Sequence, residues 1–263
     1  MLAAGARINP MKTMRILLAL VLAPAILASS AVRAADTAGT DNPTRVLFVC
    51  GGHEFETNLY VQFFKALPGV SFQFVEHPQA QAMFKADAAK AYDVIVLYDL
   101  YQKITDQAKA DLVARLKEGK GLLAMHHSIA NYQKWPEYEK IIGGKYYLEK
   151  TMVNGVEKAV STWKHDVDFK VHVADTQHPI TQGVKDFTIH DETYGGFDTG
   201  PEAHVLLTTD EPTSGSNLAW TKTYEGTRVA TMVLGHDHQA WDNPNYRQLV
   251  LQAIAWVAGK DKK

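Results

Sequence analysis

Cysteine is nearly absent from this sequence, since Cys50 is the only one among 263 residues. A single cysteine cannot form a disulfide within its own chain, which excludes a small fold held together by disulfides. Cys50 ends the apolar run "RVLFVC", a setting typical of a buried hydrophobic residue rather than of a nucleophile.

Sequence motifs for several common chemistries are also missing. Neither a GxSxG nucleophile elbow, nor a phosphate-binding P-loop, nor a dinucleotide-binding fingerprint occurs. Basic residues show no excess either, because 27 lysines and arginines face 29 acidic residues and the net charge is −2. A nucleic-acid partner is therefore not favoured.

A long apolar run occurs only near the N-terminus. Residues 16–28 read "ILLALVLAPAILA", follow Lys12 and Arg15, and precede a small-residue cleavage signal that ends at Ala34. The run is shorter than the roughly 18 residues of a membrane-spanning helix, and Pro24 interrupts it. This arrangement is typical of a secretory signal peptide.

We therefore predict a signal peptide over residues 1–34, a linker over 35–44 and a single domain over 45–259. Cleavage would remove four basic and no acidic residues and leave a net charge of −6. The mature protein would be periplasmic or secreted, with no membrane anchor.

Apolar strand-like runs alternate with helical patterns through the first half of this domain, which predicts a parallel sheet covered by helices. Thr105 and Asn243 are expected to cap two of the helices at their N-termini. Later runs such as "NLAWTKTY" predict antiparallel strands added to the parallel core. We expect the strand order 3-2-1-4, which places the first and fourth strands side by side.

Histidines follow three of the predicted strands. His53 follows the first strand, His126 and His127 follow the fourth, and "RVATMVLGHDH" ends in His236 and His238. Ligands in such sheets bind beyond the carboxyl ends of the strands, and imidazole is both a common metal ligand and a proton carrier near neutral pH. These histidines therefore predict one shared functional site at the strand ends. The alternative is that each histidine is structural, which is the more common role of a single histidine.

The segment "HDETYGG" adds carboxylates and an aromatic residue. Asp191 and Glu192 are able to complete a metal site or act as a general base, and Tyr194 follows them. Five aromatic residues are expected in loops near the mouth of the site, where an aromatic ring can stack on a sugar: Trp135, Tyr138, Trp163, Tyr194 and Trp241. Alternatively, Asp191 and Glu192 belong to a solvated loop, and the aromatic residues serve only in packing.

These motifs together resemble the trehalose-utilisation (ThuA-like) family over about residues 45–258. The similarity rests on the ordered segments "GGHEF", "LLAMHHS", "WPEYEKIIGGKY", "HPIT", "DETY", "LGHDHQAW" and "NPNYRQLVLQAIAWV". The resemblance implies a fold similar to class I glutamine amidotransferases: an α/β, flavodoxin-like three-layer sandwich with added antiparallel strands. It also implies a role in carbohydrate metabolism and in the handling of 3-keto sugars.

The nucleophile of an amidotransferase is missing at the corresponding place. Such an enzyme presents a cysteine on a strand-to-helix elbow, whereas "AMHHS" has His126 there, and Cys50 lies on a different strand. Glutamine hydrolysis by a thiolate is therefore excluded. Another departure follows "IIGGKY", where many relatives have a further histidine and this chain reads "YLEKTMV".

Carried onto these motifs, the resemblance implies residue roles for a reaction on a small sugar or glycoside. A divalent metal such as zinc would be bound, and a histidine or carboxylate would remove the proton next to a sugar ketone, with elimination or hydrolysis following. The expected metal ligands are His53, His126 and His236; the catalytic residues His127, Asp191, Glu192 and His238; and the substrate-binding residues Trp135, Tyr194 and Trp241.

Two other readings stay open. The protein could be a non-catalytic carbohydrate-binding protein on an amidotransferase-like scaffold, or a structural module whose histidines bind metal adventitiously. The oligomeric state, the sugar and its linkage are not determined by the sequence.

Overall fold

The structure is a computed structural model that describes residues 42–261. The predicted signal peptide and all but the last residues of the predicted linker lie outside the described residues. Within 42–261, no helix combines the length and the apolar character needed to cross a membrane.

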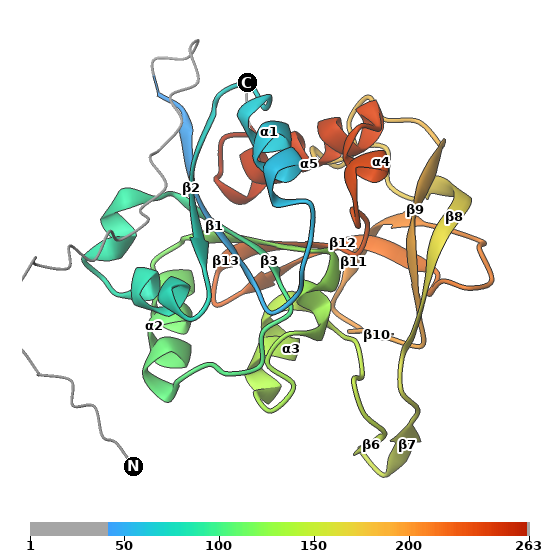
Figure 1. The fold of residues 1–263 in the computed structure, drawn as a ribbon, viewed down its shortest axis with the longest axis horizontal. Coiled ribbons are helices and arrows are strands. Elements are labelled where there is room, and N and C mark those ends of the chain that lie inside the picture. The colour runs from blue at the N-terminus through green and yellow to red at the C-terminus, as the bar shows by residue number, and fades with distance from the viewer. Residues whose placement is uncertain (1–41, 262–263) are drawn as a thin grey trace, which may run out of the picture. The chain divides into compact units, whose positions relative to one another are not determined.

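A nine-stranded mixed sheet forms the centre of the domain, in the order β2-β1-β3-β4-β13-β12-β11-β8-β9 (Figure 1). The first five strands in this order run parallel, and the other four pair antiparallel, as the sequence predicts. The strands are β1 (Thr44–Gly51), β2 (Val70–Glu76), β3 (Val94–Asp99), β4 (Gly121–Met125), β8 (Thr162–Val173), β9 (Phe187–Gly195), β11 (His204–Thr208), β12 (Asn217–Tyr224) and β13 (Thr227–Met232).

The order of the parallel strands corrects our expectation. The predicted order 3-2-1-4 is wrong, because the chain leaving β2 returns across β1 and places β3 between β1 and β4. The order β2-β1-β3-β4-β13 is that of flavodoxin-like folds, with its switch point between β1 and β3. The predicted fold class is therefore confirmed, while the neighbours of β1 differ from those expected.

Helices cover both faces of the parallel strands (Figure 1). One face carries α1 (Thr57–Lys65), α4 (His238–Trp241) and α5 (Pro244–Val257), and the other carries α2 (Asp106–Lys117) and α3 (Pro136–Ile142). Thr105 and Asn243 cap α2 and α5 as predicted, because their side-chain oxygens accept backbone N–H groups of the first turn. The strands β1 and β3 are almost fully buried, and Cys50 is a buried residue of this core, as expected.

Short 3₁₀ helices and short strands connect these elements. The 3₁₀ segments are η1 (Gln79–Phe84), η2 (Ala88–Ala91) and η3 (His126–Ala130), and the short strands are β5 (Gly144–Lys145), β6 (Thr151–Val153), β7 (Val156–Lys158) and β10 (Asp198–Thr199). The pair β6–β7 is a hairpin that projects away from the sheet (Figure 1).

Candidate functional site

The end of β4 presents His126 on a sharp strand-to-helix elbow. The backbone of His126 has φ +49°, in the left-handed region that non-glycine residues rarely adopt, and η3 starts at this residue. Its ring Nδ1 donates a hydrogen bond to the backbone oxygen of Val233 over 3.0 Å. This bond fixes the tautomer of a neutral imidazole and leaves Nε2 as the atom that faces the site.

The segment after β13 presents His236 and is held by Asp191. The Asp191 carboxylate accepts the backbone N–H groups of Gly235 and His236 over 2.7 and 2.9 Å. Burial raises the pKa of Asp191, against the lowering effects of His126 and of these backbone bonds. Gly235 has φ +105°, and a Cβ there would collide with the Tyr246 hydroxyl. The turn that carries His236 therefore depends on Asp191 and on glycine at 235.

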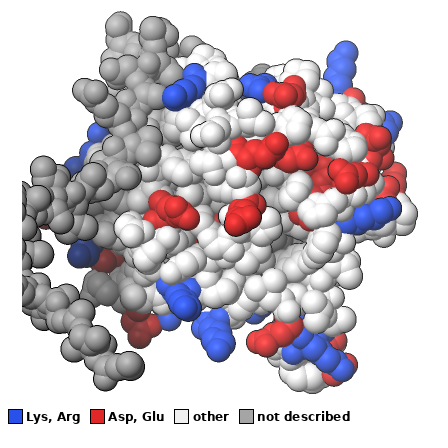
Figure 2. All heavy atoms as spheres, in the orientation of Figure 1, with Lys and Arg blue, Asp and Glu red and all other residues white. Residues whose placement is uncertain are grey.

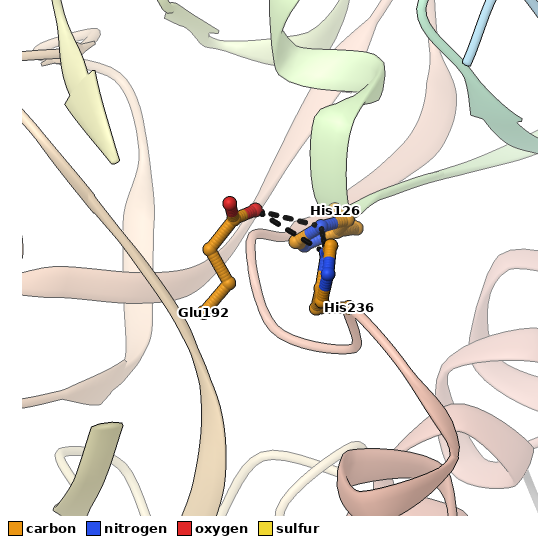
Figure 3. Close-up of side chains that lie close together, drawn as sticks. All are labelled: His126, Glu192 and His236. Atoms are coloured by element: carbon orange, nitrogen blue, oxygen red, sulfur yellow. Dashed lines mark hydrogen bonds and ion pairs between the residues drawn. The ribbon is translucent and has the colours of Figure 1, made fainter. Parts of the chain in front are cut away.

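Glu192 on β9 completes a cluster with the two histidines, and Figure 3 shows its carboxylate directed at both rings. Its Oε2 lies 3.2 Å from His126 Nε2 and 3.4 Å from His236 Nδ1, and those two nitrogens are 3.2 Å apart. We call His126, Glu192 and His236 the His–Glu cluster. Glu192 and His126 are buried, and His236 is half-buried.

The charges of this cluster are coupled. Burial raises the pKa of Glu192, but the hydrogen bonds and charges of His126 and His236 lower it more, and the net pKa lies well below its usual range. Burial lowers the pKa of His236, while the hydrogen bond and charge of Glu192 raise it, and the net result is a raised pKa. Glu192 is therefore anionic near neutral pH.

Folding thus makes His236 hold its proton more tightly, and a pH dependence of stability follows. The pKa of a histidine in the unfolded chain is about 6.5, and the stabilisation from His236 is complete below this pH. It is lost as the pH rises through the raised pKa of the folded state. We expect the difference in unfolding free energy between wild type and His236→Gln to shrink from pH 6 to pH 8.5. Urea unfolding with a chelator present measures it, and parallel pH curves for the two proteins would contradict this origin.

The donor atoms of the His–Glu cluster suit a divalent metal. One atom from each residue lies within 4.8 Å of the other two, and two imidazoles with one carboxylate form a common ligand set for zinc and related ions. With Nδ1 of His126 donating to Val233, its Nε2 faces both a Glu192 oxygen 3.2 Å away and the Tyr194 hydroxyl 2.9 Å away.

His165 is a further member of the site that our reading of the sequence did not select. Its Nδ1 lies 3.1 Å from Oε1 of Glu192, and its ring lies 4.5 Å from the ring of His236. It lies at a β-bulge. Between the pairs Lys164–Thr193 and Val167–Asp191, strand β8 has one more residue than β9. A bulge turns a side chain out of its strand alternation, and sequence alternation alone does not reveal it.

A cavity of about 380 Å³ opens beside the cluster. Glu192, His165 and Tyr194 line it together with His53 and His127. The Tyr194 hydroxyl donates to His126 Nε2 over 2.9 Å, with its ring stacked on the imidazole at 4.9 Å. Tyr194 therefore lies at the site, where we expected a substrate-binding residue.

His127 has an unusual place on the cavity wall. It is 3% exposed, and neither ring nitrogen has a hydrogen-bond partner among the described residues. Burial, followed by the charges of His126 and His53, holds the pKa of His127 well below its ordinary value. A buried imidazole without hydrogen-bond partners costs stability, so its presence calls for an explanation such as a function. His127 is thus a neutral imidazole at the cavity wall whose nitrogens have no protein partner among the described residues.

His53 does not join His126 and His236 as we expected. It lines the cavity with its ring 5.0 Å from the ring of His127, and its Nδ1 donates to the backbone oxygen of Glu54. The reason is the strand order, since β3 separates β1 from β4. Glu192 occupies the third position of the cluster instead.

His238 and Asp191 do not face the cavity, although we expected both to be catalytic residues. Asp237 caps α4, so the chain turns away after His236, and the exposed His238 pairs with Glu56 over 2.8 Å. Asp191 is 2% exposed and directs its carboxylate at backbone N–H groups, so it positions His236 rather than facing the cavity.

Two tryptophans expected at the mouth lie elsewhere. Trp241 is 1% exposed, packs on Tyr60, and donates from Nε1 to the backbone oxygen of Gly235, so it belongs to the core behind the site. Trp135 packs against Tyr132 and Tyr138 at the start of α3, away from the cavity lining. The one-turn helix α4 buries the Trp241 ring, whereas Trp135 is half-buried immediately before α3.

Several remaining histidines pair with acidic surface residues near β8 and β9, where Figure 2 shows acidic side chains gathered. His190 contacts Asp166 and Asp168, and His172 contacts Asp186. These surface pairs lie outside the cavity lining.

Comparisons with known proteins agree with this fold. A profile of the ThuA family, described as trehalose utilisation, matches residues 45–257. A ThuA-like protein from Parabacteroides merdae superposes with a TM-score of 0.68 at 19% identity, over 82% of this chain and 90% of that chain. A ThuA-like protein from Bacteroides uniformis gives 0.66 at 19% identity, over 85% and 95%.

A more distant structure, a cytoplasmic protein from Salmonella typhimurium, gives a TM-score of 0.55 at 15% identity, over 84% of this chain and 100% of that chain. None of the curated proteins matches the chain. At these identities the solved structures establish a shared fold.

Proposed function

The chain belongs to the ThuA family, and we propose that it is an exported carbohydrate-processing enzyme that acts on keto-sugars or 3-keto-glycosides. The family's description, trehalose utilisation, points to carbohydrates. The observation that carries the proposal is the His–Glu cluster behind a 380 Å³ cavity, because Glu192 lines this cavity together with the imidazoles of His53, His127 and His165.

His126, Glu192 and His236 are the residues that would hold a divalent metal. A cation bound there would supply positive charge against the negative charge that develops on the oxygens of a sugar enediolate. The Val233 carbonyl orients His126 for this task, and Asp191 fixes the backbone of His236, which are the outer contacts that metal-binding histidines generally need.

His127 is the residue that accepts the proton in this proposal. Its unpartnered nitrogens and its place on the cavity wall support this role. Its lowered pKa keeps the imidazole neutral near pH 7, so a lone pair is available.

The reaction follows from the acidity of a proton next to a ketone. A ketone at C3 acidifies the C2 proton; when His127 takes this proton, the electron pair of the C–H bond delocalises onto the C3 oxygen. The pair then forms a C1–C2 double bond as the C1–O bond breaks, and the proton passes from His127 to the departing oxygen. Addition of water across the double bond completes a net hydrolysis.

Proton NMR in deuterated buffer tests the proposal directly. We expect the purified mature protein, given a methyl 3-keto-glucoside, to exchange the C2 proton for deuterium and to release methanol. Both should stop when a chelator removes the metal and return when zinc is added. A spectrum that stays unchanged with added zinc would reject the enzyme proposal.

Sugar binding without any change at C2 would instead support the non-catalytic carbohydrate-binding protein. The missing thiolate at the elbow is the observation that favours this second candidate, because His126 stands where an amidotransferase has its nucleophile. Binding that survives His126→Ala would strengthen it.

A further inference from the structure

Three half-exposed apolar side chains form one side of the same cavity. Leu148, Val160 and Trp163 are 40%, 51% and 59% exposed, and all three line the cavity. We call these three residues the apolar rim. We propose that the apolar rim binds an apolar aglycone, so that the substrate is a glycoside of an aromatic or alkyl alcohol rather than a disaccharide; this rests on the proposed function.

The apolar rim is held in place by a hydrogen-bonded frame. Ser161 is buried between Val160 and Trp163. Its N–H donates to the Tyr147 oxygen over 2.9 Å, and its Oγ accepts the Tyr147 N–H over 2.9 Å and donates to the Gly196 oxygen over 2.9 Å. Tyr147 precedes Leu148, so both arms of the β6–β7 hairpin are tied together where they pass the cavity. Apolar side chains that are exposed on a fixed frame indicate a binding surface.

The apolar rim continues directly from the polar part of the site. Trp163 lies with its ring 4.6 Å from the ring of His165, which in turn contacts Glu192. The cavity wall therefore changes from carboxylate and imidazole to indole and then to aliphatic side chains. A ligand that matches this sequence is polar at one end and apolar at the other. A second sugar unit would place its hydroxyl groups against Leu148 and Val160, which offer no hydrogen bonds.

The size of the apolar rim favours a small group over a protein. Three half-exposed side chains of this kind present on the order of 300 Å². A phenyl or short alkyl group covers a surface of this size. A stable protein interface needs roughly 800 Å² on each partner.

Calorimetric titration with methyl and phenyl β-glucopyranoside tests the inference on the full mature chain. Neither compound has a C3 ketone, so neither reacts, and the result does not depend on the proposed C2 chemistry. Burial of a phenyl ring against the apolar rim should make the phenyl glycoside bind at least about tenfold tighter. In a Leu148→Ser/Val160→Ser variant the ratio should fall to about threefold or less.

Val156→Ser is the matched control, because Val156 is also an exposed valine of this hairpin, at 60%, but does not line the cavity. It should keep the wild-type ratio. Trp163→Ser is a second variant that should lower the ratio if the double variant does not fold.

Equal affinities for the two glycosides, or binding of neither, would overturn the inference. A dimer in sedimentation that dissociates on Val160→Ser would assign the apolar rim to a second copy and would also overturn it. The proposed function stands or falls separately, since C2 exchange with a methyl 3-keto-glucoside needs no aglycone contact. A phenyl preference without any C2 exchange would keep the aglycone site and reject the enzyme.

Discussion

Glu192→Gln should lower both zinc affinity and the rate of C2 proton exchange by at least about a hundredfold, because outer contacts of metal ligands alone are worth 10- to 100-fold. Glu192 supplies the only carboxylate of the His–Glu cluster and lies within 3.4 Å of both imidazoles. The amide that replaces it has no negative charge, and its NH₂ group repels either a cation or an imidazole N–H. Calorimetric zinc titration and NMR exchange rates measure the two effects.

Glu157→Gln is the matched control, because it makes the same change on the surface of the β6–β7 hairpin. Glu157 is exposed and pairs only with Lys150 in the described structure, and exposed ion pairs contribute little. If Glu192→Gln exchanges the C2 proton at a rate within about threefold of wild type, the His–Glu cluster does not catalyse the reaction.

Asp191→Asn should destabilise the fold by about 2–4 kcal/mol and reduce the exchange rate by at least about tenfold. Asp191 accepts three backbone N–H groups, those of Glu192, Gly235 and His236, and is almost completely buried. An asparagine has one acceptor oxygen and must turn its NH₂ group toward at least one of these donors. The segment that carries His236 then loses its anchor, so stability and activity fall together.

Urea unfolding and exchange rates on the same samples measure both effects. Asp87→Asn is the control, since Asp87 is exposed and pairs only with the neighbouring Lys90 in the described structure. A destabilised Asp191→Asn protein that keeps full activity at low temperature would separate the two roles and contradict the positioning argument.

Much of this site follows from strand ends that are visible in the sequence. His126 and His236 come directly after apolar runs, and the carboxyl ends of parallel strands meet at one edge of a sheet. Because β4 and β13 are neighbours, their two histidines meet there. Glu192 could be selected from its segment, but its position between the histidines could not, because β9 reaches the site from the antiparallel end of the sheet.

The parts that sequence could not predict depend on how the chain crosses over. The place of His53 depends on whether the chain after β2 returns past β1, and neither local periodicity nor composition records that direction. His165 depends on one additional residue in β8, which shifts the alternation by one place. Trp241 belongs to a single turn of helix, too short to show a helical pattern in its sequence.

The left-handed backbone at His126 bears on how this site could be lost. A non-glycine residue in this conformation costs about 1–2 kcal/mol, and glycine or asparagine would remove much of that cost. Either substitution would also remove a buried ring, its hydrogen bond to Val233 and its packing on Tyr194, and this loss offsets the gain in the backbone. The left-handed backbone at His126 therefore persists because the packing around its ring holds it, which ties the chemistry of this site to the integrity of the core.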